Sequence, residues 1–167
     1  MRKFLSFMLD GLTVVPASAS VADKSLSVEE SVVLDAPAEV VWARIGRFGD
    51  MSWHPALAST EIVEGSENVP GARRVLTIKN GGTIHETLTA RDAKAMELSY
   101  KITESVLPVS DYSATLSVQA EDSGSRVLWT SNFKRKTPGD DQAAVDTITN
   151  IFQSGLAQLQ ADLQIRN

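Results

Sequence analysis

Residues 71–88 read GARRVLTIKNGGTIHETL, and this stretch decides the fold. Two strand-like runs flank the turn residues Asn80-Gly81-Gly82, which is the pattern of a β-hairpin. A two-residue loop would turn the apolar residues of the two runs to opposite faces of the hairpin. A three-residue loop sets Ile78 opposite Ile84, so that the apolar residues share one face. We therefore expect the three-residue loop.

This register gives one charged residue an unusual position. It places Glu86 opposite Leu76 and between Ile84 and Leu88 on the inner face, with Arg74 diagonally within reach. A buried carboxylate without a partner costs several kcal/mol or has a raised pKa. Glu86 is therefore expected either to close one end of the sheet as an ion pair with Arg74 or to face a ligand. The sequence leaves both alternatives open.

Turn residues separate other strand-like segments on both sides of the hairpin. A first strand begins at Ser27, where alternate apolar residues share one face. The later strands are expected at Thr60–Glu64, Arg73–Lys79, Thr83–Arg91, Met96–Thr103, Tyr112–Ala120 and Arg126–Lys134. Because no helical pattern separates these later strands, they should pair as antiparallel hairpins.

Helices are expected at three places. Asp35-Ala36-Pro37 predicts a helix start with Asp35 as the capping acid, and residues 48–57, FGDMSWHPAL, predict a second short helical or irregular piece. Thr137-Pro138-Gly139-Asp140 predicts the cap of a long last helix. The apolar face of that helix consists of Val145, Ile148, Phe152, Gly155, Leu156, Leu159 and Leu163. The sequence thus predicts a single α+β domain over residues 26–165, in which about seven antiparallel strands curve around the last helix and leave a hollow.

Few polar residues are expected near this hollow besides Glu86. His54 either reaches the mouth of the pocket or makes a local hydrogen bond. The hydroxyls of Tyr100 and Tyr112 need a partner, which backbone, water or a ligand can supply. Gly155 is either a point of close packing or room for a ligand. The candidate ligand-binding residues are Trp53, His54, Arg74, Leu76, Ile78, Ile84, Glu86, Leu88, Tyr100, Tyr112, Phe152 and Gly155.

Composition argues against several classes of function. The 167 residues carry a net charge of −5 without a basic run, which disfavours nucleic acid and anionic lipid as partners. The absence of cysteine excludes disulfides and thiol catalysis. The chain has two histidines and lacks the nucleophile, metalloprotease and phosphate-loop motifs. We expect neither a metal nor a cofactor.

The N-terminal residues 1–22 have the order of a secretory signal peptide. A basic start, Met1-Arg2-Lys3, precedes an apolar stretch and small residues that offer cleavage sites at Ala17-x-Ala19 or Ser20-x-Ala22. Asp10 in the apolar stretch opposes this interpretation. No later apolar run is long enough to span a bilayer. We expect an exported protein without stable membrane insertion after processing.

Four segments carry a resemblance to a known family. FGDMSWHPAL, GARRVLTIKNGGTIHETL, ESVLPVSDYSATLSV (residues 104–118) and the last helix, in this order, resemble the SRPBCC superfamily (START-like, polyketide cyclase/dehydrase). Within it the chain is most similar to MxaD-type proteins, which are exported and associated with bacterial methanol oxidation. The resemblance runs from about Leu26 to Leu163 and implies a helix-grip fold and a periplasmic location.

The same resemblance implies roles for individual residues. The abscisic acid receptors of the superfamily contact their ligand through positions that look like Glu86, Tyr100 and Tyr112. A lysine that holds the acidic group of that ligand looks like the position of His54. Histidine is a weaker anchor for a carboxylate at neutral pH, which puts an acidic ligand in doubt. Val106-Leu107-Pro108-Val109 looks like a gating loop.

Three functions remain open from the sequence. The first is a protein that binds a small apolar or amphipathic molecule and has no enzymatic activity. An MxaD-like role would be the support of a periplasmic methanol dehydrogenase system through contact with the dehydrogenase or a cytochrome. The second is a cyclase, dehydratase or hydrolase with His54 and Glu86 as an acid–base pair and Tyr112 as the orienting group. The third is a lipid or quinone carrier, which would need a continuous apolar pocket without Glu86.

Overall fold

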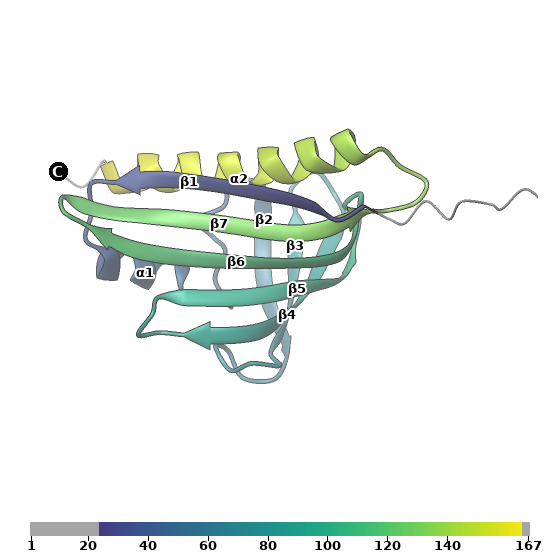
Figure 1. The fold of residues 1–167 in the computed structure, drawn as a ribbon. Coiled ribbons are helices and arrows are strands. Elements are labelled where there is room, and N and C mark those ends of the chain that lie inside the picture. Colours follow the sequence, from purple (N-terminus) through teal and green to yellow (C-terminus); the bar gives the residue numbers. More distant parts are fainter. Residues whose placement is uncertain (1–23, 165–167) are drawn as a thin grey trace, which may run out of the picture.

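The computed structural model describes residues 24–164, which form one antiparallel sheet and two helices (Figure 1). The seven strands pair in the order β1-β7-β6-β5-β4-β3-β2. Their bounds are β1 Leu26–Leu34, β2 Leu57–Glu64, β3 Arg73–Ile78, β4 Thr83–Asp92, β5 Glu97–Ser105, β6 Val109–Glu121 and β7 Gly124–Arg135. The helices are α1 Ala38–Ile45 and α2 Asp141–Gln164. The predicted α+β class and the number of strands are confirmed, whereas the signal-peptide prediction for residues 1–22 lies outside the described residues.

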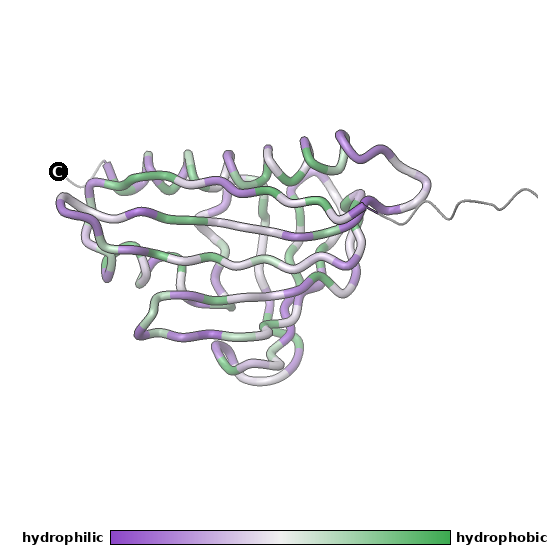
Figure 2. Tube along the Cα trace, in the orientation of Figure 1, coloured by the Kyte–Doolittle hydropathy of each residue, from purple (hydrophilic) through white to green (hydrophobic). Residues whose placement is uncertain are grey.

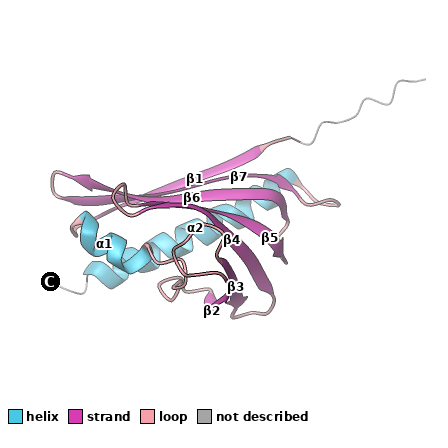
Figure 3. Ribbon diagram, turned by 90° about the horizontal axis from the view of Figure 1, so that it is seen from below, coloured by secondary structure: helices cyan, strands magenta, loops and turns pink. Residues whose placement is uncertain are grey.

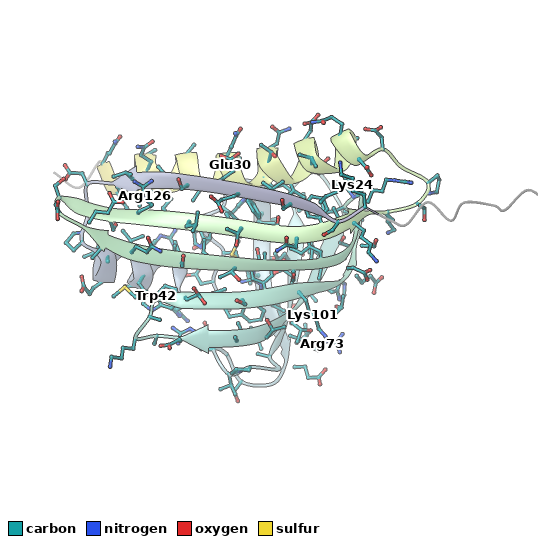
Figure 4. All side chains as sticks on the ribbon, in the orientation of Figure 1. Lys24, Glu30, Trp42, Arg73, Lys101 and Arg126 are labelled. Carbon is teal, nitrogen blue, oxygen red and sulfur yellow. The ribbon has the colours of Figure 1, made fainter. Side chains whose placement is uncertain are left out.

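The sheet curves around the long helix. In Figures 1 and 3, α2 runs along β1, β6 and β7, while β2, β3 and β4 turn away from these strands and close one side. Helix α2 packs mainly against β1 and β7. Figure 2 shows hydrophobic stretches on the strands and on α2, and the apolar side chains of both are buried in one core. The side chains labelled Arg73 and Lys101 in Figure 4 are exposed and lie away from α2.

The hairpin between β3 and β4 has the expected loop length but a different register. Leu76 lies opposite Ile84, and Arg74 lies opposite Glu86, so the prediction that Ile78 faces Ile84 is wrong by two residues. The loop is Lys79–Gly81, because the backbone N–H of Ile78 donates to the carbonyl oxygen of Gly82 over 3.1 Å. A shift by two residues keeps every side chain on its predicted face.

Two glycines with positive φ angles lie at this turn. Gly81 and Gly82 have φ angles of 103° and 90°, which residues with a side chain rarely adopt. Both must therefore lie at the turn itself. The expected loop, Asn80–Gly82, also contains both glycines, so their φ angles do not explain why the last pair of the hairpin is Ile78–Gly82 instead of Lys79–Thr83.

Two predictions about the first helical region are wrong. Asp35 does not cap α1: Pro37 occupies the N-cap position, and no side chain there bonds to the helix. Residues 46–56 contain turns and no second helix. Side chains of the next loop take up backbone donors in this stretch, since Phe48 N–H donates to Asn68 Oδ1 over 2.8 Å and Gly49 N–H donates to Glu67 Oε1 over 3.2 Å. These bonds replace the helical ones.

The start of α2 agrees with the prediction. The Asp140 Oδ1 atom accepts a hydrogen bond from the backbone N–H of Ala143 over 2.9 Å, as an N-cap residue does. The inward side chains of this helix include Ile148, Phe152 and Leu159, each at most 1% exposed. The helix is therefore held in one rotational position, which fixes the residues that it presents to the sheet.

Candidate functional site

A cavity of about 100 Å³ lies between the sheet and α2. Eight of the residues predicted from the sequence line it: His54, Leu76, Ile78, Ile84, Glu86, Tyr100, Tyr112 and Phe152. Four predicted residues do not line it: Trp53, Arg74, Leu88 and Gly155, which are buried behind the lining. Eight further residues complete the wall: Met51, Ala56, Leu57, Ile102, Leu107, Trp129, Ile148 and Ile151. Most of this wall is hydrocarbon.

Glu86 is the charged residue of the cavity wall, and it is paired. Nε and Nη2 of Arg74 lie 2.7 Å and 2.6 Å from the same carboxylate oxygen, Oε2 of Glu86. The two side chains are 2% and 5% exposed. Burial raises the pKa of Glu86, and the Arg74 guanidinium acts in the opposite direction. Glu86 therefore forms the ion pair with Arg74, which was one of the two alternatives, and its side chain also borders the cavity.

Arg74 is enclosed on all sides. Its Nη1 atom donates to the carbonyl oxygen of Phe48 over 2.7 Å. The guanidinium carbon lies 4.2 Å from the centre of the Phe48 ring and 5.3 Å from that of Tyr100, which are cation–π distances. Arg74 therefore connects the loop after α1 to the sheet behind the cavity and presents its charge to Glu86 alone.

His54 contributes its ring to the cavity wall but not a free nitrogen. Its Nδ1 atom accepts a hydrogen bond from the backbone N–H of Ala56 over 3.2 Å, so that the proton lies on Nε2, which is 2.9 Å from the carbonyl oxygen of Ile151. Burial lowers the pKa of His54, and the bond to Ile151 opposes this shift. The local hydrogen-bonding role, one of the two alternatives, is the one that the structure shows. The residue joins the loop to α2.

The two tyrosines form one cluster with a tryptophan. The indole N–H of Trp129 donates to the hydroxyl oxygen of Tyr100 over 3.0 Å, and the ring centres of Tyr100 and Tyr112 lie 6.4 Å apart. Burial, together with the nearby Glu86, raises the pKa of both tyrosines well above the ordinary value. Both hydroxyls therefore stay protonated at neutral pH, and that of Tyr112 donates a hydrogen bond to that of Tyr100.

Gly155 is a point of close packing. A Cβ atom at this position would lie 2.7 Å from Cδ2 of His54 and 3.2 Å from Cζ3 of Trp129. Only glycine lets α2 approach these two rings so closely. Of the two alternatives for Gly155, close packing is therefore the one seen.

Two loops meet at one end of the cavity. Leu107 lines the cavity, and its exposed neighbour Val106 fills the space beside Gly82, since a Cβ there would lie 2.8 Å from a methyl carbon of Val106. The outer surface beside this loop has a groove of about 590 Å³ between the ends of β5 and β6. Ile102 and Tyr112 line both hollows.

The sequence indicates some of the additional lining residues and gives no indication of others. The apolar periodicity places Ile148 on the inner stripe of α2, and Trp129 lies on an expected strand, so the inward faces of these elements indicate both residues. Met51, Ala56 and Leu57 come from the irregular stretch before β2 or from its first residue. A segment without periodicity gives no signal for which side chains point inward.

Neither a metal site nor a membrane span is seen in the part of the chain that the structure describes. Residues 24–164 contain no group of three or more His, Cys, Asp or Glu side chains that could hold a metal ion. No helix among them is long and apolar enough to cross a bilayer.

The sequence from residue 25 to residue 164 matches the family described as polyketide cyclase/dehydrase and lipid transport. The chain belongs to this family. The match covers both helices and all seven strands, and it confirms the resemblance to the SRPBCC superfamily that the four segments carried. A comparison with curated proteins gave no match.

Solved structures of similar proteins share the helix-grip fold. The protein XoxI from Bacillus cereus is 28% identical with a TM-score of 0.76, over 83% of this chain and 95% of that protein. A protein from Nitrosospira multiformis is 29% identical with a TM-score of 0.74, over 85% of this chain and all of that protein. Ara h 8.0201, at 21% identity and a TM-score of 0.70 over 86% of this chain and all of that one, is similar in fold alone. These proteins and this chain therefore share the overall fold.

Proposed function

We propose that the protein binds a small apolar or amphipathic molecule in the cavity between the sheet and α2. The observation that carries the proposal is a buried carboxylate, Glu86, at the edge of a cavity whose wall is otherwise mostly apolar. A core built only for stability gains nothing from such a group, because a buried ion pair is often no more stable than apolar residues of the same volume. Membership in a family described by cyclase, dehydrase and lipid-transport functions also favours a cavity that holds a ligand.

The size of the cavity limits the ligand. Ligand pockets usually enclose roughly 300–1,000 Å³. At about 100 Å³, this cavity accepts a molecule of a few heavy atoms as it stands. A larger ligand requires a displacement of the wall, for which the loop that carries Leu107 is suited because its neighbour Val106 is 61% exposed. The ligand is therefore small, or it moves this loop on entry.

A cavity-filling substitution tests this function. Leu76→Phe adds a ring on the inner face of β3, where Leu76 lines the cavity. The matched control, Val75→Phe, adds the same group to the next residue, which points to the other face of the same strand. An NMR titration with toluene should show saturable binding to the wild type and to Val75→Phe and a loss of at least about tenfold in affinity for Leu76→Phe. Equal binding to all three proteins would contradict a ligand site in this cavity.

The geometry gives less support to an enzyme with His54 and Glu86 as acid and base. Both ring nitrogens of His54 are bonded to backbone atoms of Ala56 and Ile151. One oxygen of Glu86 is bonded twice to Arg74. A general base must reach a proton of the substrate, which His54 cannot do without breaking a bond. A lipid or quinone carrier is less favoured for another reason, because Glu86 lies in the wall that such a ligand would contact.

We further propose an exported, periplasmic protein with an MxaD-like role in support of a methanol dehydrogenase system. The order of residues 1–22 and the resemblance of the later segments support this proposal. Cell fractionation with measurement of the intact mass tests export, since processing near Ala19 or Ala22 removes a defined mass. Recovery of the unprocessed chain from the cytoplasm would contradict it. Copurification from periplasm without a dehydrogenase or cytochrome would contradict the partner role.

A further inference from the structure

We propose that the cavity selects small neutral molecules that donate a hydrogen bond, such as alcohols and phenols, and that it rejects carboxylic acids. This inference rests on the proposed binding function and names the class of ligand for the same site. The acceptor for the ligand's hydrogen bond would be Oε1 of Glu86.

The two carboxylate oxygens of Glu86 differ in their contacts. Both nitrogens of Arg74 that contact this carboxylate lie against Oε2. Among residues 24–164, no group forms a hydrogen bond with Oε1, although Glu86 is 5% exposed. Glu86 lines the cavity, so a molecule inside it can reach the oxygen that Arg74 leaves open. Oε1 keeps some accessible surface, because the side-chain N and O atoms of residues 24–164 that are both buried and unpaired are Trp53 Nε1 and Ser131 Oγ. A ligand hydroxyl at Oε1 would donate a hydrogen bond to a charged acceptor, and such bonds are stronger than those between neutral groups.

The guanidinium group of Arg74, which carries the positive charge behind Glu86, is already fully engaged. Arg74 directs Nε and Nη2 to Glu86 and Nη1 to the carbonyl oxygen of Phe48. The rings of Phe48 and Tyr100 lie against its guanidinium group. Arg74 thus has no open side for a second carboxylate. An acidic ligand would meet the carboxylate of Glu86 at close range in a site of low dielectric constant, where like charges repel strongly.

His54 offers no positive charge to a ligand, and the Arg74–Glu86 pair is neutral overall. His54, whose position looks like that of a ligand-holding lysine, directs its ring N–H to Ile151 and offers no cation. Arg74 already balances the charge of Glu86, so that the pair is neutral overall. An ammonium ligand would bring an unbalanced charge into a mostly apolar cavity, which is also unfavourable. A neutral donor is the group that the wall accommodates.

The volume sets the scale of the molecule. A cavity of roughly 150 Å³ in another protein admits benzene. The cavity here, at about 100 Å³, is of the same order. A six-membered ring with one hydroxyl is larger than the present cavity, so its entry requires the displacement of the loop that carries Leu107 described above. Phenol is the probe that combines such a ring with a single donor group.

Four ring compounds that differ in one substituent test the proposal on the wild-type protein: phenol, toluene, benzoate and benzylammonium. The side-chain N–H signal of Trp129, a residue of the cavity wall, reports binding by NMR. Phenol should bind at least about tenfold more tightly than toluene, as expected for a hydrogen bond to a charged group. Neither benzoate nor benzylammonium should saturate the signal. Equal affinities for phenol and toluene, or tighter binding of either ion, would overturn the selectivity and leave the apolar binding site standing. Failure of both phenol and toluene to bind would overturn the binding function itself.

A substitution at Glu86 provides a second, independent readout. In Glu86→Gln, the amide oxygen should face Arg74 and the amide N–H₂ should face the cavity, so that an acceptor becomes a donor. The advantage of phenol over toluene should fall to about twofold or less, and anisole, an ether that only accepts, should gain affinity. Glu104→Gln, an exposed carboxylate on neighbouring β5, is the matched control and should keep the wild-type selectivity. Unchanged selectivity in Glu86→Gln would overturn the role of Oε1. The wild-type series remains decisive if this variant does not fold.

Discussion

Arg74 and Glu86 lie directly opposite each other on β3 and β4, and the guanidinium contacts a single oxygen of the carboxylate. The pair is buried, and Arg74 also holds the carbonyl oxygen of Phe48. One ion pair thus connects two strands, the loop after α1 and the wall of the cavity. Removal of the pair should lower stability through the loss of these connections, and it should change ligand selectivity through the loss of the Glu86 acceptor.

The first prediction concerns the stability of this pair. Arg74→Met leaves Glu86 buried without a counter-charge and should lower the free energy of unfolding by about 3–5 kcal/mol. The double variant Arg74→Met/Glu86→Leu removes both charges and should recover most of this loss, because apolar residues can replace a buried pair. Urea denaturation of both variants measures the difference. A double variant as unstable as Arg74→Met would show that the bond from Arg74 to Phe48, and not the charge balance, stabilises the fold.

Sequence reasoning found the faces of the strands because they depend only on whether a position is odd or even. The register of the β3–β4 hairpin was displaced by two residues, yet Leu76, Ile84 and Glu86 remained on the inner face. The same displacement changed the relation of Arg74 to Glu86 from diagonal to directly opposite. Apolar matching is nearly equal in both registers, so the pattern of apolar residues does not decide between them.

The rest of the site could not be found in this way, for reasons that differ between residues. His54 was identified, but its bond to Ile151 joins residues 97 positions apart, and no local pattern encodes such a contact. Arg74 and Leu88 share the inner face without lining the cavity, because the curvature of the sheet decides which inward side chains reach the hollow. Periodicity predicts a face; it does not predict where two curved layers separate.

The second prediction concerns the pH dependence of stability at His54. Burial lowers the pKa of His54 in the folded protein below its ordinary value of 6.5. The unfolded chain then binds more protons between the two pKa values, so stability should fall as the pH decreases below about 6.5. One extra proton sets a limit of about 1.4 kcal/mol per pH unit. The measurement is the free energy of unfolding from neutral pH to the acidic end of this window.

A histidine variant isolates this effect. The raised pKa of Glu86 contributes with the opposite sign, since stability from that group falls as the pH rises above 4.5 through its folded pKa. The difference between the wild type and His54→Gln removes this contribution, which both proteins share. The difference should change with pH. A constant difference for His54→Gln would contradict a neutral, buried His54.

The third prediction concerns the pH dependence of ligand selectivity. Glu86 accepts a strong, charge-assisted hydrogen bond from a ligand only while it is ionised, and a neutral carboxyl group accepts a weaker one. The advantage of phenol over toluene should therefore be largest above the pKa of Glu86 and decline as the pH falls through it. Burial raises this pKa above the ordinary value of 4.5, and the decline should therefore begin at a higher pH than for an exposed glutamate. Arg74, Tyr100 and Tyr112 face Glu86 and keep their protonation states in this range. Titration of both probes at several pH values in His54→Gln, which lacks the nearby histidine, measures the effect. A ratio independent of pH down to 4.5 would contradict it.

The fourth prediction concerns the packing of α2 at Gly155. By helix propensity alone, Gly155→Ala should stabilise the helix by about 1 kcal/mol. The new methyl group would, however, lie 2.7 Å from the ring of His54 and 3.2 Å from that of Trp129, and neither ring is at the end of a flexible chain. Overpacking of this kind costs about 1–3 kcal/mol. We expect a net loss of stability and a displaced His54 ring, visible as a weakened bond from Nε2 to the Ile151 carbonyl.

The neighbouring position supplies the control for this prediction. Ser154 is exposed on α2, so Ser154→Ala gains helix propensity without meeting another side chain and should leave stability unchanged or raise it by a few tenths of a kcal/mol. Thermal unfolding of both variants, with the NMR signals of the His54 ring, separates the two effects. If Gly155→Ala were as stable as Ser154→Ala, α2 would have room to move away from the sheet. The cavity wall formed by Ile148, Ile151 and Phe152 would then be adjustable rather than fixed, and the ligand could be larger than the present hollow.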